Sequence, residues 1–313
     1  MMTTLKKILS TADRGKYAVG AFNINNLEVL QAVIETATEL NSPVIVQTTE
    51  GAIEYAGLDY LVAMVKVAAK APVPVALHLD HGKDLKVVKK TIDAGYTSVM
   101  YDGSILPYKE NVRNTRKVVS WAHRKGVSVE AEIGAIQGVE DLVSVSEKQA
   151  FFTDPDEALR FWKETDCDAL AISIGTAHGP NKFKTKAELD IPRLKKIDAL
   201  VKVPLVLHGA SEIDEEMVKL AGKNCNVFGD CNRLAKAKGV PDTEIRKAIR
   251  AGIRKVNIDS DLRIAFTAGI RQAIIKKNDT IDPRKLLAPS KELMKDVVRD
   301  RMRVFGCKGR AKK

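Results

Sequence analysis

The feature of this sequence that most constrains its fold is an alternation, repeated eight times, of a short β-rich run and a stretch with helical periodicity. The first run, 17–23, precedes a stretch in which Leu27, Leu30 and Ile34 fall on one helical face. Eight such units over about 260 residues favour a closed (β/α)8 TIM barrel over an open doubly wound α/β sheet. The expected strands are 17–23, 43–49, 72–80, 96–102, 127–133, 168–176, 203–209 and 254–259.

We expect the whole chain, 1–313, to form a single barrel domain. No GxGxxG motif opens a helix after the first strand, which argues against a dinucleotide-binding fold. Three additions to a simple barrel are expected. A long loop after strand five, 134–153, has the length of a mobile lid, and an insertion, 212–240, separates strands seven and eight. An extra C-terminal helix, 289–306, is available for docking on a partner subunit.

The composition narrows the class of protein. No apolar run reaches the roughly 18 residues that a bilayer requires, and the N-terminus lacks the features of a secretory signal. The four cysteines form no CxxC pair, which is typical of reduced thiols in a cytoplasmic protein. The net charge of +11 suits anionic metabolites, but aromatic residues make up only 5% and do not alternate with basic ones. We therefore predict a cytoplasmic protein that binds no nucleic acid and no membrane.

Polar side chains gather where the expected strands end, which is where barrel enzymes place their chemistry. The residues expected at this rim are Asn23, Thr49, Asp80, His81, Asp102, Glu132, His178, His208, Asn257 and Asp259.

Three of these residues, His81, His178 and His208, are histidines that follow three different strands. Neutral imidazoles that converge over the barrel mouth would supply three metal ligands and leave one position open to substrate. The spacings match no local metal motif, so this hypothesis depends on the strand assignment. The alternative is that each histidine is an isolated polar residue at a strand end.

Three carboxylates accompany the histidines. Asp80, next to His81, could exchange a proton with a substrate hydroxyl beside a bound cation. Asp102 and Glu132 could orient a ligand histidine through its second nitrogen or act as alternate metal ligands, or could serve only solubility at the rim. Of the remaining histidines, we expect His78 to be packed and hydrogen-bonded and His123 to lie on a helix surface.

The loops after strands seven and eight, LHGAS and NIDSD, predict a phosphate site, because barrels commonly bind phosphate there. Gly209 lets the backbone approach closely, Ser211 and Ser260 supply hydroxyl groups, and Lys182 adds a positive charge. Asp259 would cap the helix or hold a substrate hydroxyl. The alternative for Asp259 and Ser260 is an ordinary helix N-cap.

Seven motifs occur in the order found in one known family: AVGAFNINN, ALHLDHG, TSVMYDGS, VEAEIG, ISIGTAHG, LVLHGAS and KVNIDSDLR. Over 16–309 the chain resembles the metal-dependent class II fructose-bisphosphate aldolases, a family that includes tagatose-bisphosphate aldolases.

The resemblance implies one catalytic zinc ion per subunit on His81, His178 and His208. Cobalt or another divalent ion is an alternative, and a monovalent cation is a further candidate cofactor. Zinc would polarise the C2 carbonyl of dihydroxyacetone phosphate. Asp80 resembles the family's acid/base at the C4 oxygen, and Glu140 in the lid resembles the glutamate that exchanges the C3 proton. Sugar bisphosphate and triose phosphates are then the partners, in a homo-oligomer (dimer or tetramer).

The same resemblance predicts the substrate contacts. The part of the substrate that becomes dihydroxyacetone phosphate would contact Gly179, Lys182, Gly209, Ser211, Asn257, Asp259 and Ser260. Asn23 and Thr49 would contact the substrate at the opposite rim. Arg263, Asp282 and Arg284 resemble elements that reach the second phosphate, in some members from a neighbouring subunit. In one departure, Glu212 stands where the family often has glycine and places an anion near the phosphate loop.

Other functions stay open at this point. Tagatose 1,6-bisphosphate is the nearest alternative substrate, and a zinc hydrolase on the same barrel is a different class of enzyme. A basic nucleic-acid-binding or scaffold protein is the non-enzyme alternative. A Schiff-base aldolase is not expected, because we find no lysine at the end of a strand inside the barrel.

Overall fold

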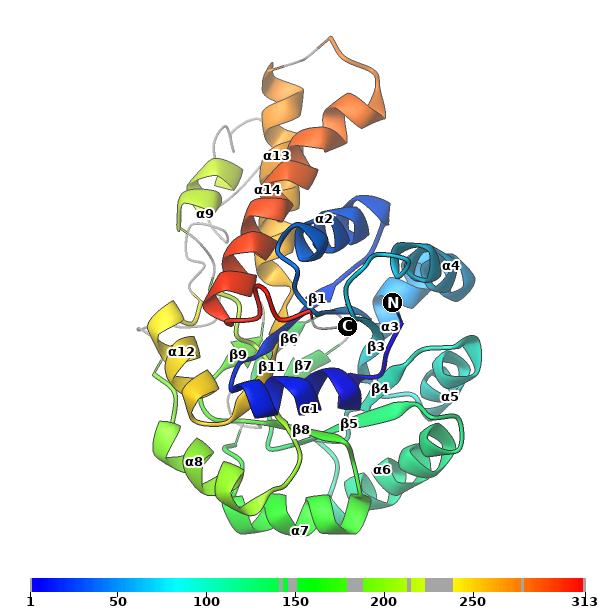
Figure 1. The fold of residues 1–313 in the computed structure, drawn as a ribbon, viewed down its shortest axis with the longest axis vertical. Helices are drawn as coiled ribbons and strands as arrows, with labels where there is room; N and C mark the ends of the chain where they lie inside the picture. The colour runs from blue at the N-terminus through cyan, green and yellow to red at the C-terminus, as the bar shows by residue number, and fades with distance from the viewer. Residues whose placement is uncertain are drawn as a thin grey trace.

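The computed structural model describes residues 2–140, 143–145, 151–178, 188–212, 215–222, 239–276 and 279–311. Its centre is a closed barrel of parallel strands in the order β1-β11-β10-β8-β5-β4-β3-β2 (Figure 1). The strands are β1 (Val19–Asn23), β2 (Val44–Thr48), β3 (Val75–Gly82), β4 (Ser98–Tyr101), β5 (Ser128–Ile133), β8 (Ala169–Ile172), β10 (Leu205–Leu207) and β11 (Ile253–Ile258). The expected barrel is confirmed.

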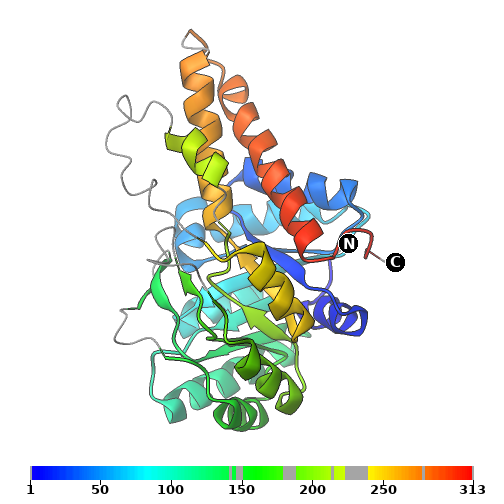
Figure 2. The same ribbon diagram turned by 90° about the vertical axis from the view of Figure 1, so that its left-hand side faces the viewer.

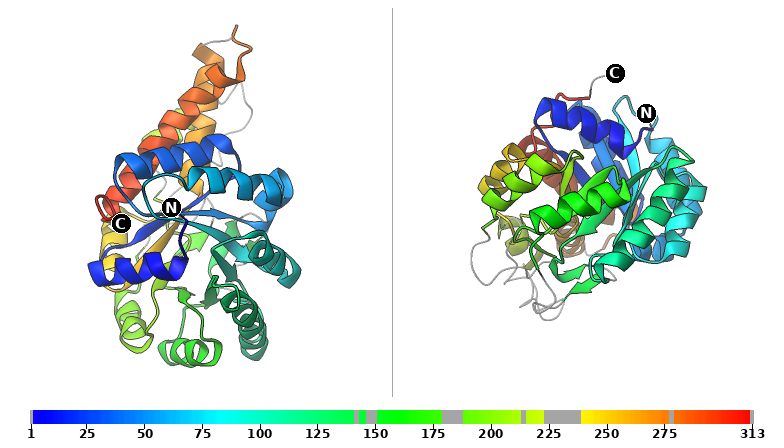
Figure 3. Two further views of the ribbon diagram at one scale, coloured as in Figure 1. Left: turned by 45° about the vertical axis from the view of Figure 1, so that its right-hand side comes forward. Right: turned by 90° about the horizontal axis from the view of Figure 1, so that it is seen from below.

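Helices cover the outside of this barrel (Figure 3). Their starts are set locally: Asn26 accepts a hydrogen bond from Val29 N at the first of them, and Asp154 precedes a proline and caps another. They are α2 (Leu27–Glu39), α3 (Glu50–Ala56), α4 (Leu58–Ala68), α5 (Leu85–Ala94), α6 (Tyr108–His123), α7 (Pro155–Thr165), α8 (Ile191–Leu200), α12 (Asp242–Arg250) and α13 (Ser260–Lys276).

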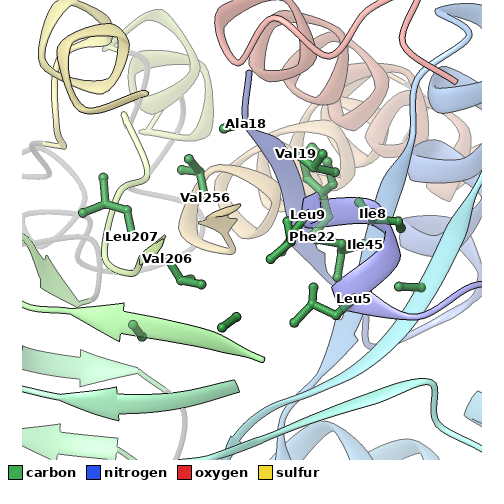
Figure 4. Close-up of a cluster of buried hydrophobic side chains, with 14 of the residues drawn as sticks. Leu5, Ile8, Leu9, Ala18, Val19, Phe22, Ile45, Val206, Leu207 and Val256 are labelled. Carbon is green, nitrogen blue, oxygen red and sulfur yellow. The ribbon is translucent and has the colours of Figure 1, made fainter. Parts of the chain in front are cut away.

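Helix α1 (Leu5–Gly15) closes the amino-terminal end of the barrel. Thr3 N donates to Val75 O at 2.9 Å and Lys6 N to Ser128 Oγ at 3.1 Å, and both acceptors lie at the first residue of a barrel strand. Leu5 and Leu9 are fully buried in a cluster that includes Phe22 (Figure 4). With this end sealed, the carboxyl ends of the strands form the accessible mouth.

All three additions to the barrel are present, and those after β5 and β10 lie where the sequence predicts them. The segment after β5 forms β6 (Gln137–Glu140) and β7 (Val143–Val145), which join β9 (Ala177–His178) in a small sheet. Helix α9 (Glu215–Gly222) begins the insertion, of which 223–238 lie outside the described residues.

The C-terminal helix α14 (Pro283–Val304) begins earlier than the sequence predicts, because Asp282 caps its N-terminus and Pro283 occupies the first helical position. Helices α13 and α14 form a hairpin that projects from the barrel (Figures 1 and 2). Within the described part of the chain, no helix is both long and apolar enough to cross a membrane.

The seal at the amino-terminal end yields a stability prediction. Leu9→Ala should reduce the free energy of unfolding by about 2–5 kcal/mol, because it leaves a cavity in a packed cluster. Urea denaturation followed by circular dichroism would measure this. Lys7→Ala, on the exposed side of the same helix, is the control and should change the value by less than about 0.5 kcal/mol. Equal effects of the two substitutions would contradict the packing role of α1.

Candidate active site

The carboxyl half of the barrel interior is lined by polar residues at alternate strand positions, as the two-residue period of a strand requires. His78 and Asp80 come from β3, Glu130 and Glu132 from β5, and Lys255 and Asn257 from β11. All six are buried, and none is more than 4% exposed. The barrel therefore encloses a polar cluster where a simple barrel has apolar side chains.

Asp80 lies at the centre of three amide side chains. Its Oδ2 accepts hydrogen bonds from Asn23 Nδ2 and Gln47 Nε2, both at 3.0 Å, and its Oδ1 accepts one from Asn257 Nδ2 at 2.9 Å. The donors come from β1, β2 and β11, so barrel closure brings them together. The three bonds fix the orientation of a fully buried carboxylate.

The backbone at His81 explains how two adjacent residues serve one site. His81 has φ of 48°, in the left-handed region, and the pairing of β3 with β4 shifts register between Leu79 and Gly82. A regular strand would send Asp80 and His81 to opposite faces, and the local turn overrides this alternation. Such a conformation in a histidine is uncommon and is found mostly at functional sites.

Carboxylates orient His81 and His208, the two candidate metal ligands whose side chains the structure describes. His81 Nδ1 donates to Asp102 Oδ2 at 2.8 Å, and Asp102 Oδ1 accepts from Ser104 Oγ at 2.7 Å. Carboxylate–histidine pairs of this kind set the ring orientation so that the other nitrogen, Nε2, can bind a metal. Burial lowers the pKa of His81, but the charge of Asp80 and the bond to Asp102 outweigh it and raise the pKa well above the ordinary value.

His208 lies between two glutamates of β5. Its Nδ1 donates to Glu132 Oε2 and its Nε2 to Glu130 Oε1, both at 2.9 Å. Burial opposes the charged ring, but the bonds to Glu130 and Glu132 raise the pKa of His208 to about 9. The ring centroids of His81 and His208 are 4.6 Å apart.

The donor set fits a divalent cation. Ligand atoms of Asp80, His81 and His208 lie within 4.8 Å of one another, as do those of His81, Asp102 and Glu132. The protons on two imidazoles provide the positive charge that one divalent ion would supply in their place. If a ring nitrogen of His208 held a metal ion, the hydrogen bond from that nitrogen to Glu132 or Glu130 would open.

The third candidate ligand, His178, is placed only by its backbone. It lies in β9, where it pairs with Gly138 of β6, and its side chain is outside the described residues. Glu140 is the last residue of β6, and its side chain is also outside them. The small sheet therefore connects the backbone of the expected lid to the backbone of the third histidine.

Sequence reasoning missed three buried residues of this site: Gln47, Glu130 and Lys255. Lys255 lies in the middle of β11 and not at its end, so the expectation that no strand ends in a lysine inside the barrel is not contradicted; the residue is fully buried, and its Nζ lies 2.9 Å from Glu130 Oε2. An amine held in an ion pair is not poised as a nucleophile. The two-residue period of a strand could have located two of them: Lys255 precedes Asn257 by two residues and Glu130 precedes Glu132 by two, so each pair lies on the same face of its strand.

The two other histidines, His78 and His123, each hydrogen-bond with a residue far away in the sequence. His78 Nδ1 hydrogen-bonds with Ser98 Oγ at 2.7 Å, and burial lowers its pKa to about 3. The predicted packed, hydrogen-bonded histidine is confirmed. His123 lies on the surface of a helix, as predicted: it is the last residue of α6, its side chain is about one-third exposed, and its Nε2 hydrogen-bonds with Asp168 Oδ2 at 2.8 Å.

The expected phosphate loops are adjacent in the barrel, because β10 pairs with β11. Gly209 has φ of 61°, and a Cβ there would lie 2.6 Å from Ala177 O, so only glycine is accommodated. Ser211 and Ser260 are buried at the ends of the two loops. Gly179 and Lys182 lie outside the described residues.

A pocket of about 410 Å³ opens beside Asp80's amide partner Asn23, between α3 and α13. Asp259 and Arg263 line it and bond each other at 2.8 Å. Thr49 lies nearby but caps α3 by accepting from Ala52 N at 3.1 Å. The pocket extends the mouth of the barrel toward the α13–α14 hairpin.

Asp282 and Arg284 are not brought to this mouth within one chain. They lie at the start of α14, at the outer end of the hairpin, and bond each other at 2.9 Å (Figures 1 and 2). Arg284 is largely exposed.

A TIM barrel whose mouth holds imidazoles oriented by buried carboxylates defines a metal-dependent barrel enzyme. The family model for class II fructose-bisphosphate aldolase matches residues 3–310. A fructose-bisphosphate aldolase of Thermus caldophilus is 46% identical over 99% of this chain and 100% of that protein. One from Helicobacter pylori is 45% identical over 98% of each.

Solved structures agree with these relatives. The YdjI aldolase of Escherichia coli K12 superposes with a TM-score of 0.79 at 29% identity, over 100% of both chains. The chain belongs to the class II fructose-bisphosphate aldolase family, whose members are carbon–carbon lyases that generally depend on a divalent metal.

The protonated imidazoles predict pH-dependent metal affinity. His208, with a pKa of about 9, and His81, whose pKa is raised well above its ordinary value, each hold a proton at pH 7 that metal must displace. Affinity should therefore rise with pH between 6 and 8, by up to about 100-fold per unit for two protons. Calorimetry of zinc binding in buffers of different ionisation enthalpy would count the protons released. Release of none would contradict this account.

Proposed function

We propose that this chain catalyses the reversible aldol cleavage of fructose 1,6-bisphosphate to dihydroxyacetone phosphate and glyceraldehyde 3-phosphate. The observation that carries the proposal is the buried Asp80, held by three amides next to two carboxylate-oriented histidines. Tagatose bisphosphate and hydrolysis are less favoured, since the relatives that match the whole chain are named fructose-bisphosphate aldolases.

We propose zinc as the metal, held by His81, His178 and His208. Imidazole ligands with carboxylates behind them suit zinc, and cobalt tolerates the same geometry. When bound, the ion supplies Lewis-acid polarisation of the substrate carbonyl. Asp102 and Glu132 hold the rings of His81 and His208 in the orientation that this binding requires.

Asp80 is proposed as the acid/base for the C4 hydroxyl. Cleavage of the C3–C4 bond requires that the hydroxyl proton leave as the aldehyde forms, and Asp80 is the carboxylate fixed by three amides beside His81. Oδ1 of Asn257 is buried, and among the described residues it has no hydrogen-bond partner. A substrate hydroxyl would satisfy this acceptor, which fits a polyhydroxylated substrate.

Glu140 is proposed to transfer the second proton, to and from C3. It ends β6, whose neighbour β9 carries His178, so a hairpin linked to the metal site presents it. One carboxylate fixed in the barrel is poorly placed for both protons, whereas a hairpin over the mouth can approach from another side.

The phosphate groups are assigned to the barrel rim. Backbone N–H groups near Gly209 and the hydroxyls of Ser211 and Ser260 would bind the dihydroxyacetone phosphate half, together with Gly179 and Lys182, which lie outside the described residues. Asn257 and Asp259 would contact its hydroxyl groups, and Asn23 and Thr49 the opposite rim. Arg263 borders the pocket next to Asp259 and would face the second phosphate.

We further propose a single domain that works as a homo-oligomer, a dimer or a tetramer. Asp282 and Arg284, at the tip of the hairpin, could reach a substrate only in another subunit, and Ile281 beside them is 95% exposed. A cytoplasmic location is proposed from the cysteines, because the described pair, Cys167 and Cys307, are free thiols that are buried.

The central test is a comparison of cleavage rates on fructose and tagatose 1,6-bisphosphate. The fructose isomer should be cleaved faster, EDTA should abolish the reaction, and added zinc should restore it. Release of inorganic phosphate without triose phosphate formation would instead identify a hydrolase.

Asp80→Asn should keep the buried volume, bind zinc and lower the cleavage rate about 10²–10⁴-fold, the usual contribution of a general acid/base. Steady-state kinetics together with metal analysis would measure both properties. Ser98→Ala, which changes a hydroxyl beside His78, serves as a buried polar control. A cleavage rate within threefold of wild type would exclude Asp80 from the proton transfer.

Glu140→Gln should slow exchange of the C3 proton of dihydroxyacetone phosphate with solvent deuterium, while metal content stays the same. Asp80→Asn should leave this exchange largely intact, because its proton belongs to the C4 oxygen. Nuclear magnetic resonance follows the exchange directly. Normal exchange in Glu140→Gln would assign the C3 proton to another residue.

A further inference from the structure

Each of the two serines assigned to phosphate is followed by an acidic residue. Glu212 follows Ser211 after β10, and Asp261 follows Ser260 at the start of α13. A carboxylate beside a bound phosphate dianion weakens binding unless it is neutralised or turned away. The placement of these two side chains therefore affects the proposed substrate site.

Both acids lie near one arginine of the C-terminal helix. Arg301 of α14 is 3% exposed, and its Nη2 contacts the carboxylate of Glu212. Burial lowers the pKa of Arg301, but nearby negative charges raise it, and Asp261 is prominent among them. Arg301, Glu212 and Asp261 line one pocket, together with Asp296 and Asp300 of α14.

The same arginine holds the far end of the insertion. Arg301 Nη1 lies 2.7 Å from Asp242 Oδ1, at the start of α12. There Val240 N donates to Ser211 O at 3.0 Å, and Gly239 is pressed so closely on the backbone of Ser211 and Glu212 that a Cβ would overlap it. The chain leaves the phosphate loop at Glu212 and returns at Gly239, and Arg301 binds it on both sides of the insertion.

We propose that Arg301 is a positioning residue of the phosphate site. Its guanidinium keeps the carboxylates of Glu212 and Asp261 on the α14 side of the two loops and neutralises that of Glu212, so that neither carboxylate faces the phosphate beside Ser211 and Ser260. The inference rests on the proposed function, since it concerns the phosphate loops of that site. It also accounts for glutamate at a position where the family often has glycine.

The charges around Glu212 give this role a pH signature. Burial raises the pKa of Glu212 to about 7; Arg301 opposes the rise, and Asp242, Asp261 and Asp300 add to it. Loss of Arg301, whose charge opposes the rise, would raise the pKa of Glu212 further, so that Glu212 would be nearly neutral at low pH and repulsive only at high pH, where it is ionised. A purely structural defect would not follow this profile.

The test measures binding of dihydroxyacetone phosphate to the zinc-loaded protein by calorimetry, with KM and kcat for fructose 1,6-bisphosphate alongside. Arg301→Met should weaken binding at least fivefold at pH 8.5 and less at pH 6.5, each relative to wild type at the same pH. The change should appear in KM, with kcat within about threefold of wild type. Adding Glu212→Gln to Arg301→Met should recover most of the lost affinity, because it removes the carboxylate that Arg301 neutralised.

The matched control is Arg299→Met, two residues away on the same helix, which breaks ion pairs to Glu39 and Asp296 but touches neither loop. It should leave binding within twofold of wild type. Unchanged binding in Arg301→Met, or a double variant no better than Arg301→Met, would overturn the inference.

Glu212→Gln alone tests the same point if Arg301→Met does not fold. With Arg301 present its affinity should stay within twofold of wild type, and a gain of fivefold or more would show that the carboxylate was never neutralised. Wild-type protein that neither binds dihydroxyacetone phosphate nor cleaves fructose 1,6-bisphosphate would refute the proposed function itself.

Discussion

The hydrogen bonds between His208 and the two glutamates of β5 are the interaction on which the site depends. Buried carboxylates are costly to desolvate unless donors surround them, and here each glutamate has a histidine or lysine partner within 2.9 Å. Asp102 and His81 repeat this arrangement one strand away. The barrel interior thus carries several negative charges. These charges favour a cation at the mouth, either protons on the histidines or a metal ion in their place.

The strand order determines which side chains surround Asp80 at the mouth of the barrel. β3, β1, β2 and β11 meet at Asp80, whose donors Asn23 and Asn257 lie 57 and 177 residues away in sequence. The small sheet of β6, β7 and β9 then ties the proposed lid to the strand of His178. The residues proposed for proton transfer, for metal binding and for the lid therefore lie at one end of the fold, and α14 contacts the same end from outside through Arg301.

Much of this could be predicted, and the reasons are local. Strand runs, helix faces and caps such as Asn26 and Asp154 express periodicity and hydrogen bonding within a few residues. The rim positions of His81, Asp102 and His208 followed from strand ends, and the structure places them together. The sequence predicts that the C-terminal helix begins at Pro289, but Asp282 caps α14 and Pro283 opens it, so Pro289 lies inside the helix.

The sequence by itself determined the eight strands, the helices between them and the kinds of side chain at the barrel mouth, since each depends on neighbours along the chain. Only the tertiary structure decided which charges meet. Lys255 pairs with Glu130 across 125 residues, and Arg301 with Glu212 across 89. Those partnerships follow from barrel closure and from the packing of α14. Both are set by long-range contacts, and no local pattern in the sequence records them.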